Sequence, residues 1–289
     1  MADDAEQHAL RRSLSDAALA GAITAGVTVR DLGAEEMAEA SALLAEVWGL
    51  GPRESPMEPG LLVAMAFAGN HVSGAFAADG TMVGACAGFF GTPLGGLLHS
   101  HIAAARPGAG RGVGTALKLH QRAWCADRGI GVIAWTYDPL IARNAWFNLG
   151  RLGAHVEAYL VDFYGPMDDG LNAGEESDRL LVHWPVEPAE VAPPETDGAY
   201  AALTVGADGR PVAATGLPEG TETVTLAVPH DVEALRAGAR PGDRAAASAW
   251  RGTFREVYAG LHAQGWRVRG FVKTGQYVLD RPHHEPETP

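Results

Sequence analysis

The stretch RPGAGRGVGTALKLH, residues 106–120, places glycines at 108, 110, 112 and 114 and then continues in residues that favour helices. It follows a strand candidate, GGLLHSHIAAA, over 95–105. The first N–H groups of a helix have no partner inside the helix, and the helix dipole adds partial positive charge there. Because glycine has no Cβ, those N–H groups can approach an anion closely. The stretch therefore predicts an anion cradle, and the alternative is an ordinary tight connection.

Positive charge is scarce elsewhere in the chain. The formal net charge is −13 and the sequence pI is near 5.2, which argues against a nucleic-acid partner because such proteins need clustered basic residues. Arg106, Arg111 and Lys118 lie in or beside the glycine-rich stretch and are the expected source of local positive charge. Neither a P-loop nor a dinucleotide fingerprint matches the spacing of these glycines.

Strand and helix signals alternate around this stretch. Strands are expected at 27–32, at 95–105, at 130–139 and as a hairpin over 71–90 that turns at Asp79-Gly80. Helices are expected over 33–50, 61–70, 112–128 and 140–154, from apolar residues at helical spacing and from the glycine that ends each of the last two. This order predicts an α/β fold (α+β mixed sheet) that is parallel at least locally.

Composition divides the chain into segments. We expect an N-terminal helical segment (1–26), a main domain (27–186), a Pro-rich linker (187–198), a C-terminal α/β extension (199–281) and a disordered tail (282–289). Within the extension, strands are expected at 200–205, 223–228, 266–272 and 276–280. A helix is expected from Asp243, its N-cap, to the stop at Gly265, with Trp250 and Phe254 facing inward.

The location of the protein is also an expectation from composition. No apolar run is long enough for a signal sequence or a membrane span, so we expect a cytoplasmic protein without a membrane partner. Cys86 and Cys125 lack metal-ligand spacing, so no metal is expected. Only two lysines accompany twenty arginines, and Ala and Gly are abundant, which is typical of a GC-rich bacterial genome.

Two motifs carry a family resemblance. GAGRGVGTALK resembles the pyrophosphate loop of the GNAT N-acetyltransferases, whose pattern is Arg/Gln-x-x-Gly-x-Gly/Ala; Gly112 and Gly114 match its small positions, and Ala109 stands where the family has Arg or Gln. RNAWFNLGRLGA (143–154) resembles the family's Asn-containing helix. The order of elements over 27–163 also fits, and together with DFYG and SDRLLVHW these motifs resemble a GNAT subgroup with a C-terminal extension.

The resemblance implies a GNAT-type acyl-CoA N-acyltransferase fold and a ligand set. Acetyl-CoA, or another acyl-CoA, would be the co-substrate, and the amine of a small molecule would attack its thioester directly. A homodimer is one assembly that the resemblance leaves open. The residues that match the family's acyl-CoA contacts are Ile102, Ala103 and Ala104 on the strand, Gly110, Arg111, Gly112, Val113, Gly114 and Thr115 in the loop and helix start, and Asn144.

The chain departs from the family at the usual acid and base. The strand has no Glu, and Leu149 stands where the family has Tyr. His101 is the candidate base, because an imidazole titrates near neutral pH; its alternative is a hydrogen-bonded core histidine. Asp138 is the candidate group that orients the amine, or else a helix cap. Tyr164 is the candidate acid, with Tyr137 as a second, or else a packed aromatic.

Several alternatives stay open at this stage. The acidic segment 164–178 suits a cationic amine substrate, although most such runs are solvated surface. Without the usual acid and base, the acyl-CoA site fits another acyl-CoA reaction equally well. A non-catalytic acyl-CoA-binding module is the third hypothesis. The sequence does not identify the acceptor.

Overall fold

The computed structural model describes residues 2–51, 54–165, 175–189 and 192–281. By its contacts the chain divides into two compact units, which we describe separately. The first unit comprises residues 1–135 and 183–189, and the second comprises residues 136–182 and 190–289.

The first unit contains the elements that the glycine-rich stretch connects. They are α1 (Ala2–Ala25), β1 (Thr28–Asp31), the 3₁₀ turn η1 (Ala34–Glu36), α2 (Met37–Val47), α3 (Pro59–Phe67), β2 (His71–Phe76), β3 (Met82–Phe90), β4 (Leu97–Ala105), α4 (Val113–Asp127) and the first residues of β5 (Val132–Tyr137). β1 to β4 pair antiparallel in sequence order, and β4 pairs with β5 in parallel. The mixed sheet and the order of elements expected from the sequence are confirmed.

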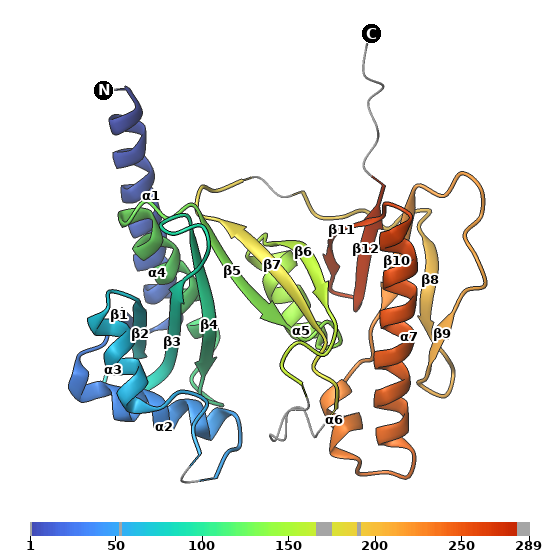
Figure 1. Cartoon of the computed structure of the whole chain (residues 1–289), viewed down its shortest axis with the longest axis horizontal. Coiled ribbons are helices and arrows are strands. Elements are labelled where there is room, and N and C mark those ends of the chain that lie inside the picture. The colour runs from blue at the N-terminus through green and yellow to red at the C-terminus, as the bar shows by residue number, and fades with distance from the viewer. Residues whose placement is uncertain (1, 52–53, 166–174, 190–191, 282–289) are drawn as a thin grey trace. The chain divides into compact units, whose positions relative to one another are not determined.

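Helices cover both faces of this sheet. α2 and α3 pack on one face, through a cluster that includes Leu43, Leu62 and Met82. α4 packs on the other face through Val113 and Leu117, and α1 runs alongside α4 (Figure 1). All six residues of β2 are buried, as expected for a strand covered on both faces. The sheet therefore fixes the start of α4 next to the end of β4.

The second unit contains the rest of β5 and the remaining elements. They are α5 (Ala142–Ala145), the π-helical turn η2 (Trp146–Arg151), β6 (His155–Leu160), β7 (Arg179–Pro185, whose last residues belong to the first unit), β8 (Tyr200–Val205), β9 (Pro211–Ala213), β10 (Thr223–Ala227), α6 (Val232–Ala237), α7 (Asp243–Ala263), β11 (Arg267–Val272) and β12 (Gln276–Asp280). Five of these strands form a sheet in the order β11-β12-β10-β8-β9. Only the β10–β8 pair is parallel. The C-terminal segment thus folds as the predicted α/β extension.

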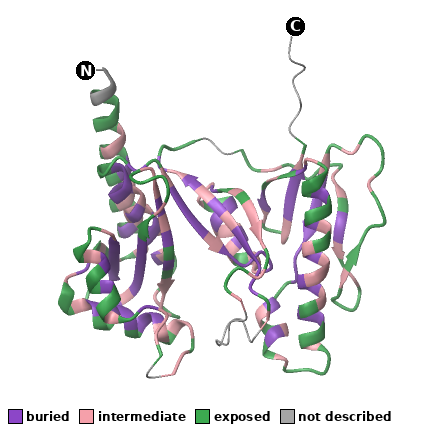
Figure 2. Ribbon diagram, in the orientation of Figure 1, coloured by how far each residue is buried: buried purple, intermediate pink, exposed green. Residues whose placement is uncertain are grey.

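α7 supplies much of the core of the second unit. Trp250 and Phe254 are fully buried, as predicted, and Figure 2 shows buried positions along β10 and β12 as well. Asp243 is not the N-cap that the sequence predicted. The helix begins at Asp243 itself, after Gly242, whose φ of +91° suits glycine.

The helix expected over 140–154 is shorter and less regular than predicted. α5 has only four residues, and a π-helical turn follows it. The ring of Trp146 lies against Gly150, where a Cβ would come within 2.4 Å of Cε3. Glycine at 150 therefore makes room for the Trp146 ring within this turn.

Two expectations about domain organisation remain predictions. The linker predicted over 187–198 implies that the segments on either side of it fold independently, which is a question of stability. The tail predicted to be disordered, 282–289, lies outside the described residues. Among the residues that the structure describes, no helix combines the length and apolarity needed to span a membrane.

Candidate functional site

β4 contains an extra residue at the point where the sequence predicts a base. Ile102 pairs with Ala87 and Ser100 with Gly88, so that His101 has no partner residue on β3. Gly88 permits this irregularity, because a Cβ there would lie 2.9 Å from the carbonyl oxygen of His99. Bulges of this kind bend a strand and redirect a side chain, and they occur often beside active sites.

β4 also parts from β5 shortly after the two strands meet. The parallel pairing joins Leu97–His99 to Val132–Ala134, whereas β4 continues to Ala105. Over residues 100–105 the described pairing of β4 is with β3 alone. Ala103 is exposed and Ala104 is half-buried, while Ile102 is buried. Along residues 100–105, which we call the free edge of β4, the side of the strand away from β3 has no strand partner in the described pairings, so backbone groups there are left for other acceptors or donors.

The loop after β4 has a backbone that suits glycine. Gly108, Gly110 and Gly112 have φ of +84°, +92° and +98°. A Cβ at Gly108 or Gly110 would meet nothing within 4 Å, so it is the backbone conformation and not lack of space that favours glycine there. Gly112 is the N-cap of α4 and has no side chain to bond the first N–H groups of the helix. The N–H groups of Val113, Gly114 and Thr115 are therefore suited to an anion.

Of the three cationic side chains expected at the loop, Arg106, Lys118 and Arg111, only Arg111 is exposed. Arg106 donates from Nε to Oε2 of Glu46 (3.1 Å) and from Nη1 to the carbonyl oxygen of Met82 (3.0 Å). Lys118 is 4% exposed and donates to Oγ of Ser100 (2.7 Å). The expectation for Lys118 is wrong, because its side chain turns into the core beneath the sheet.

His101 lies in a small group of rings on the surface of β3 and β4. The ring centroids of Phe89 and His99 lie 5.6 and 6.1 Å from that of His101. Loss of water contact lowers the pKa of His101 below its ordinary value, and it lowers the pKa of His99 to about 4, with a further contribution from His101. Both imidazoles are therefore neutral at pH 7, the form that accepts a proton.

His99 was missed as a site residue by the sequence analysis. It lies two positions before His101, which normally places two side chains on one face of a strand. The bulge at His101 alters that alternation, and yet the two rings remain neighbours. The signal for His99 was the repeated histidine in HSH (99–101).

Asp138 belongs to the second unit and is 4% exposed. Its Oδ1 accepts from the N–H of Leu140 (2.9 Å) and from Nη1 of Arg251 (2.9 Å). Its Oδ2 accepts from Nη2 of Arg236 (2.6 Å) and of Arg251 (2.7 Å). Burial opposes ionisation, but Arg251 and Arg236 outweigh it and hold the pKa of Asp138 below its ordinary value. The structure thus gives Asp138 an arginine-binding role; its proposed contact with an amine stays a prediction.

Tyr164 and Asn144 also lie in the second unit. The hydroxyl of Tyr164 is 3.1 Å from Oγ1 of Thr136, and the residue is 42% exposed. Asn144 is half-buried on α5. The hydroxyl of Tyr137 is bonded to that of Tyr277 (3.2 Å) within the core. Of the two tyrosines considered as acids, Tyr164 is therefore the accessible one.

The acidic segment 164–178 is described only in part, because residues 166–174 lie outside the described residues. Its last three acidic residues, Glu175, Glu176 and Asp178, form ion pairs with arginines. Glu175 accepts from Nε of Arg236 (3.0 Å), and Arg255 binds both Glu176 (2.5 Å) and Asp178 (2.6 Å). These three acids are therefore not simply solvated surface.

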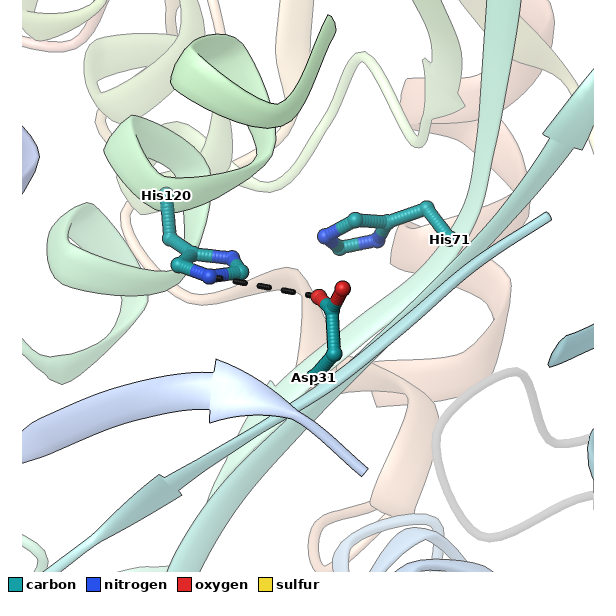
Figure 3. Close-up of side chains that lie close together, drawn as sticks. All are labelled: Asp31, His71 and His120. Carbon is teal, nitrogen blue, oxygen red and sulfur yellow. Dashed lines mark ion pairs between the residues drawn. The ribbon is translucent and has the colours of Figure 1, made fainter. Parts of the chain in front are cut away.

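A second polar group lies in the first unit, where Asp31, His71 and His120 come together (Figure 3). Asp31 and His120 line a cavity of about 480 Å³ between α1, β1 and α4. Nε2 of His120 is 4.0 Å from Oδ1 of Asp31. One carboxylate and two imidazoles could hold a metal ion, provided that the ring nitrogen of each histidine that faces the ion carries no proton.

Hydrogen bonds behind His71 argue against the metal-binding form. Lys118 donates to Oε1 of Gln121 (3.3 Å), so the amide nitrogen of Gln121 faces Nδ1 of His71 (3.3 Å) and donates to it. Neutral His71 then carries its proton on Nε2, and a protonated nitrogen is no metal ligand. Nε2 of His71 has no hydrogen-bond partner among the described residues, so in this form it is a buried N–H donor without an acceptor and not a metal ligand.

Comparisons with known proteins give similarity in structure only. No protein-family model matches the chain, and no curated protein matches its sequence. Solved structures similar to it include Ard1 from Thermoplasma volcanium, with 16% identity over 56% of this chain and 99% of that chain and a TM-score of 0.43. A GNAT phosphinothricin acetyltransferase from Sinorhizobium meliloti, solved with AcCoA, has 17% identity over 59% and 94% and a TM-score of 0.46.

A third similar structure is an N-acetyltransferase from Staphylococcus aureus, with 11% identity over 56% of this chain and 99% of that chain and a TM-score of 0.45. The solved structures that the chain resembles thus include members of the GNAT superfamily. At these identities and TM-scores the similarities assign neither an activity nor a substrate to this chain.

Proposed function

We propose that this chain is an acyl-CoA-dependent N-acyltransferase that moves an acyl group, acetyl in the first instance, to the amine of a small molecule. The observation that carries the proposal is the continuity of β4, loop and α4. A strand with a bulge at His101 and a free edge leads directly into a loop with three glycines of positive φ and a helix without a side-chain cap. Such a path can hold a thioester at one end and a pyrophosphate at the other.

The chemistry follows from these positions. Backbone N–H groups of Ile102 to Ala104 would donate to the thioester carbonyl oxygen, where negative charge develops. The N–H groups from Gly110 to Thr115, with the guanidinium of Arg111, would bind the pyrophosphate. Neutral His101 would take the proton of the amine as the C–N bond forms and the C–S bond breaks. Tyr164, Asn144 and Asp138 belong to the second unit and stay predictions from the sequence, Tyr164 as the donor of the proton that the leaving thiolate takes up, Asn144 as a contact of the acyl-CoA and Asp138 as a contact of the amine.

The first test is calorimetric titration of the purified protein with acetyl-CoA. Arg111→Glu reverses the charge beside the loop at an exposed position, and Arg12→Glu, on α1, makes the same change in net charge elsewhere. We expect saturable binding by the unaltered protein and by Arg12→Glu. For Arg111→Glu we expect at least about tenfold weaker binding, because one charge-assisted contact is lost and one repulsion is gained. Equal weakening in both variants would contradict a specific site at the loop.

Turnover separates the proposed enzyme from its alternatives. Thiol release from acetyl-CoA is measured with a panel of small amines, and the acylated amine is identified by mass spectrometry. An acylated product supports the transferase. Binding without thiol release favours the non-catalytic module, and thiol release without an acylated amine favours another acyl-CoA reaction. Absence of binding to any acyl-CoA would overturn the proposal altogether.

A further inference from the structure

A cavity in the second unit has a different character from the acyl-CoA path. Its volume is about 420 Å³, and it lies against one face of α7. Arg244, Ser248 and Arg251 line it at positions i, i+4 and i+7, which fall on one side of a helix. Arg236 of α6 and the acidic residues Glu175 and Glu176 complete the polar wall. In a chain with a net charge of −13, this concentration of arginine is unusual.

The base of the cavity is built and held in place. Arg236 and Arg251 are 2% and 4% exposed, and each donates to Asp138, over 2.6 Å and 2.7 Å respectively. Arg251 binds both carboxylate oxygens of Asp138 in the bidentate manner that fixes a guanidinium plane. Asp138 therefore fixes the two guanidinium groups in place before any ligand arrives.

Both buried arginines keep an unused donor. Nη1 of Arg236 and Nε of Arg251 have no hydrogen-bond partner among the described residues. A buried N–H of a charged group without an acceptor is costly, and such groups in folded proteins normally have a partner in a bound molecule or water. Both arginines also line the cavity, so each has one donor left for an acceptor other than Asp138 and Glu175.

Glu175 indicates that the cavity suits a carboxylate or a similar oxyanion. Its Oε2 accepts from Nε of Arg236 (3.0 Å), and its Oε1 lies 3.5 Å from Oγ of Ser248. A carboxylate of the chain itself thus already uses part of the cavity wall. Arg244, which is exposed, lies over Gly238, where a Cβ would come within 2.8 Å of its Nε.

Arg236 and Arg251 are ion-paired with Asp138 and Glu175. Glu176, the other acidic residue of the wall, shares Arg255 with Asp178. Arg244 has no ion-pair partner among the residues that the structure describes, so its charge is the one left for an added anion.

We propose that this cavity binds an oxyanion, the carboxylate or phosphate group of a small molecule, through Arg236, Arg251 and Arg244, and that Glu175 competes with it as an internal ligand. The proposal does not depend on acyl transfer. It gives the C-terminal extension a binding role, because all three arginines lie within 199–281.

The test is calorimetric titration with succinate and, separately, with inorganic phosphate at constant ionic strength. The protein carries Arg111→Glu, so that phosphate binding at the start of α4 is suppressed. Three further changes are compared in this background. Arg244→Gln removes an exposed cation of the cavity, Arg240→Gln removes an exposed arginine that does not line it, and Glu175→Gln removes the competing carboxylate.

We expect saturable binding of at least one probe, and the probe that binds identifies the anion class. Arg244→Gln should weaken it about tenfold, through loss of one charge-assisted hydrogen bond, Arg240→Gln should leave it unchanged, and Glu175→Gln should strengthen it severalfold. Saturation by neither probe would overturn the proposal, as would equal weakening by Arg244→Gln and Arg240→Gln. Weaker binding by Glu175→Gln would overturn the competing role of Glu175. None of these results depends on acetyl-CoA binding, so the two proposals fail separately.

Discussion

At the scale of single residues, both the position and the protonation state of His101 suit the proposed role of a base. The bulge in β4 leaves it without a partner residue on β3, and its surroundings lower its pKa below the ordinary value. A base that is already neutral at pH 7 needs no prior deprotonation to accept the proton of an amine.

We therefore expect kcat/KM to fall as the pH drops below 6.5, because His101 becomes protonated there. This fall is the acidic limb of the pH–rate profile. His101→Gln should remove this limb and lower the rate by about 10² to 10⁴-fold, the usual contribution of a general base. His99→Gln is the matched control, because the pKa of His99 is already about 4 and its ring lies beside that of His101. The measurement is the pH–rate profile of all three proteins. If His99→Gln, and not His101→Gln, removes the limb, the base is His99.

Lys118 is the second residue whose environment has a measurable consequence. Burial lowers its pKa from 10.5 to about 8, while Ser100 and Gln121 accept from its Nζ. Between pH 8 and 10.5 the unfolded chain keeps a proton that the folded chain has released, so stability rises with pH in this window.

The expected gain from Lys118 across that window is roughly 3 kcal/mol in the free energy of unfolding, at about 1.4 kcal/mol per pKa unit. Lys118→Met should lack this rise, whereas Lys273→Met, which replaces the exposed second lysine, should retain it. Urea unfolding of the three proteins at pH 7 and pH 10.5 measures the difference. The same pH dependence in all three proteins would show that burial does not lower the pKa of Lys118.

At the scale of elements, the connection from β4 to α4 depends on backbone conformation. Gly110 and Gly112 both have φ above +90°, a region that costs an L-residue roughly 1–2 kcal/mol. Only Gly112 also has a neighbour, since its Cβ would lie 3.3 Å from Cβ of Ala25 in α1.

We expect Gly110→Ala to destabilise the protein by about 1–2 kcal/mol and Gly112→Ala by more. Gly60→Ala is the control, because Gly60 lies in α3 with open space around it and without a positive φ. Alanine there should be neutral or stabilise by up to about 1 kcal/mol. Urea unfolding midpoints give the comparison. Three equal values would mean that the loop has another conformation in solution.

At the scale of the whole molecule, the second unit joins two stretches that are distant in sequence. Asp138 is bound by Arg236 and Arg251, and Asp178 is bound by Arg255. The hydroxyl of Tyr277 donates to the carbonyl oxygen of Pro139 (2.8 Å). Segment 136–182 is thus completed by the C-terminal extension.

We expect a fragment of residues 1–192 to lose cooperative folding of segment 136–182. Without the extension, Asp138 loses Arg236 and Arg251 and keeps only the more distant Arg179, whose Nη1 is 4.0 Å from its Oδ2, and Pro139 loses the hydrogen bond from Tyr277. Near-UV circular dichroism and thermal unfolding measure the loss, and removal of 282–289, predicted to be disordered, is the control. A stable, cooperative fragment would instead support the domain boundary predicted over 187–198.

The sequence by itself determined the class of fold, the order of elements and the position of the glycine-rich loop. These follow from local signals, namely apolar periodicity, glycine and proline, which act within a few residues. The hairpin at Asp79-Gly80 and the strand at 200–205 are confirmed for this reason, and the sheet is parallel locally, as expected, where β4 pairs with β5.

The tertiary structure alone decided which charged and polar side chains face a ligand. Lys118 and Arg111 lie seven residues apart, and yet one is buried and the other exposed. Asp138 finds its partners about a hundred residues away in α6 and α7. Local patterns do not encode such contacts, because the burial of a charge depends on which distant element supplies its counter-charge. The loop was therefore readable from sequence, whereas the arginine-lined cavity was not.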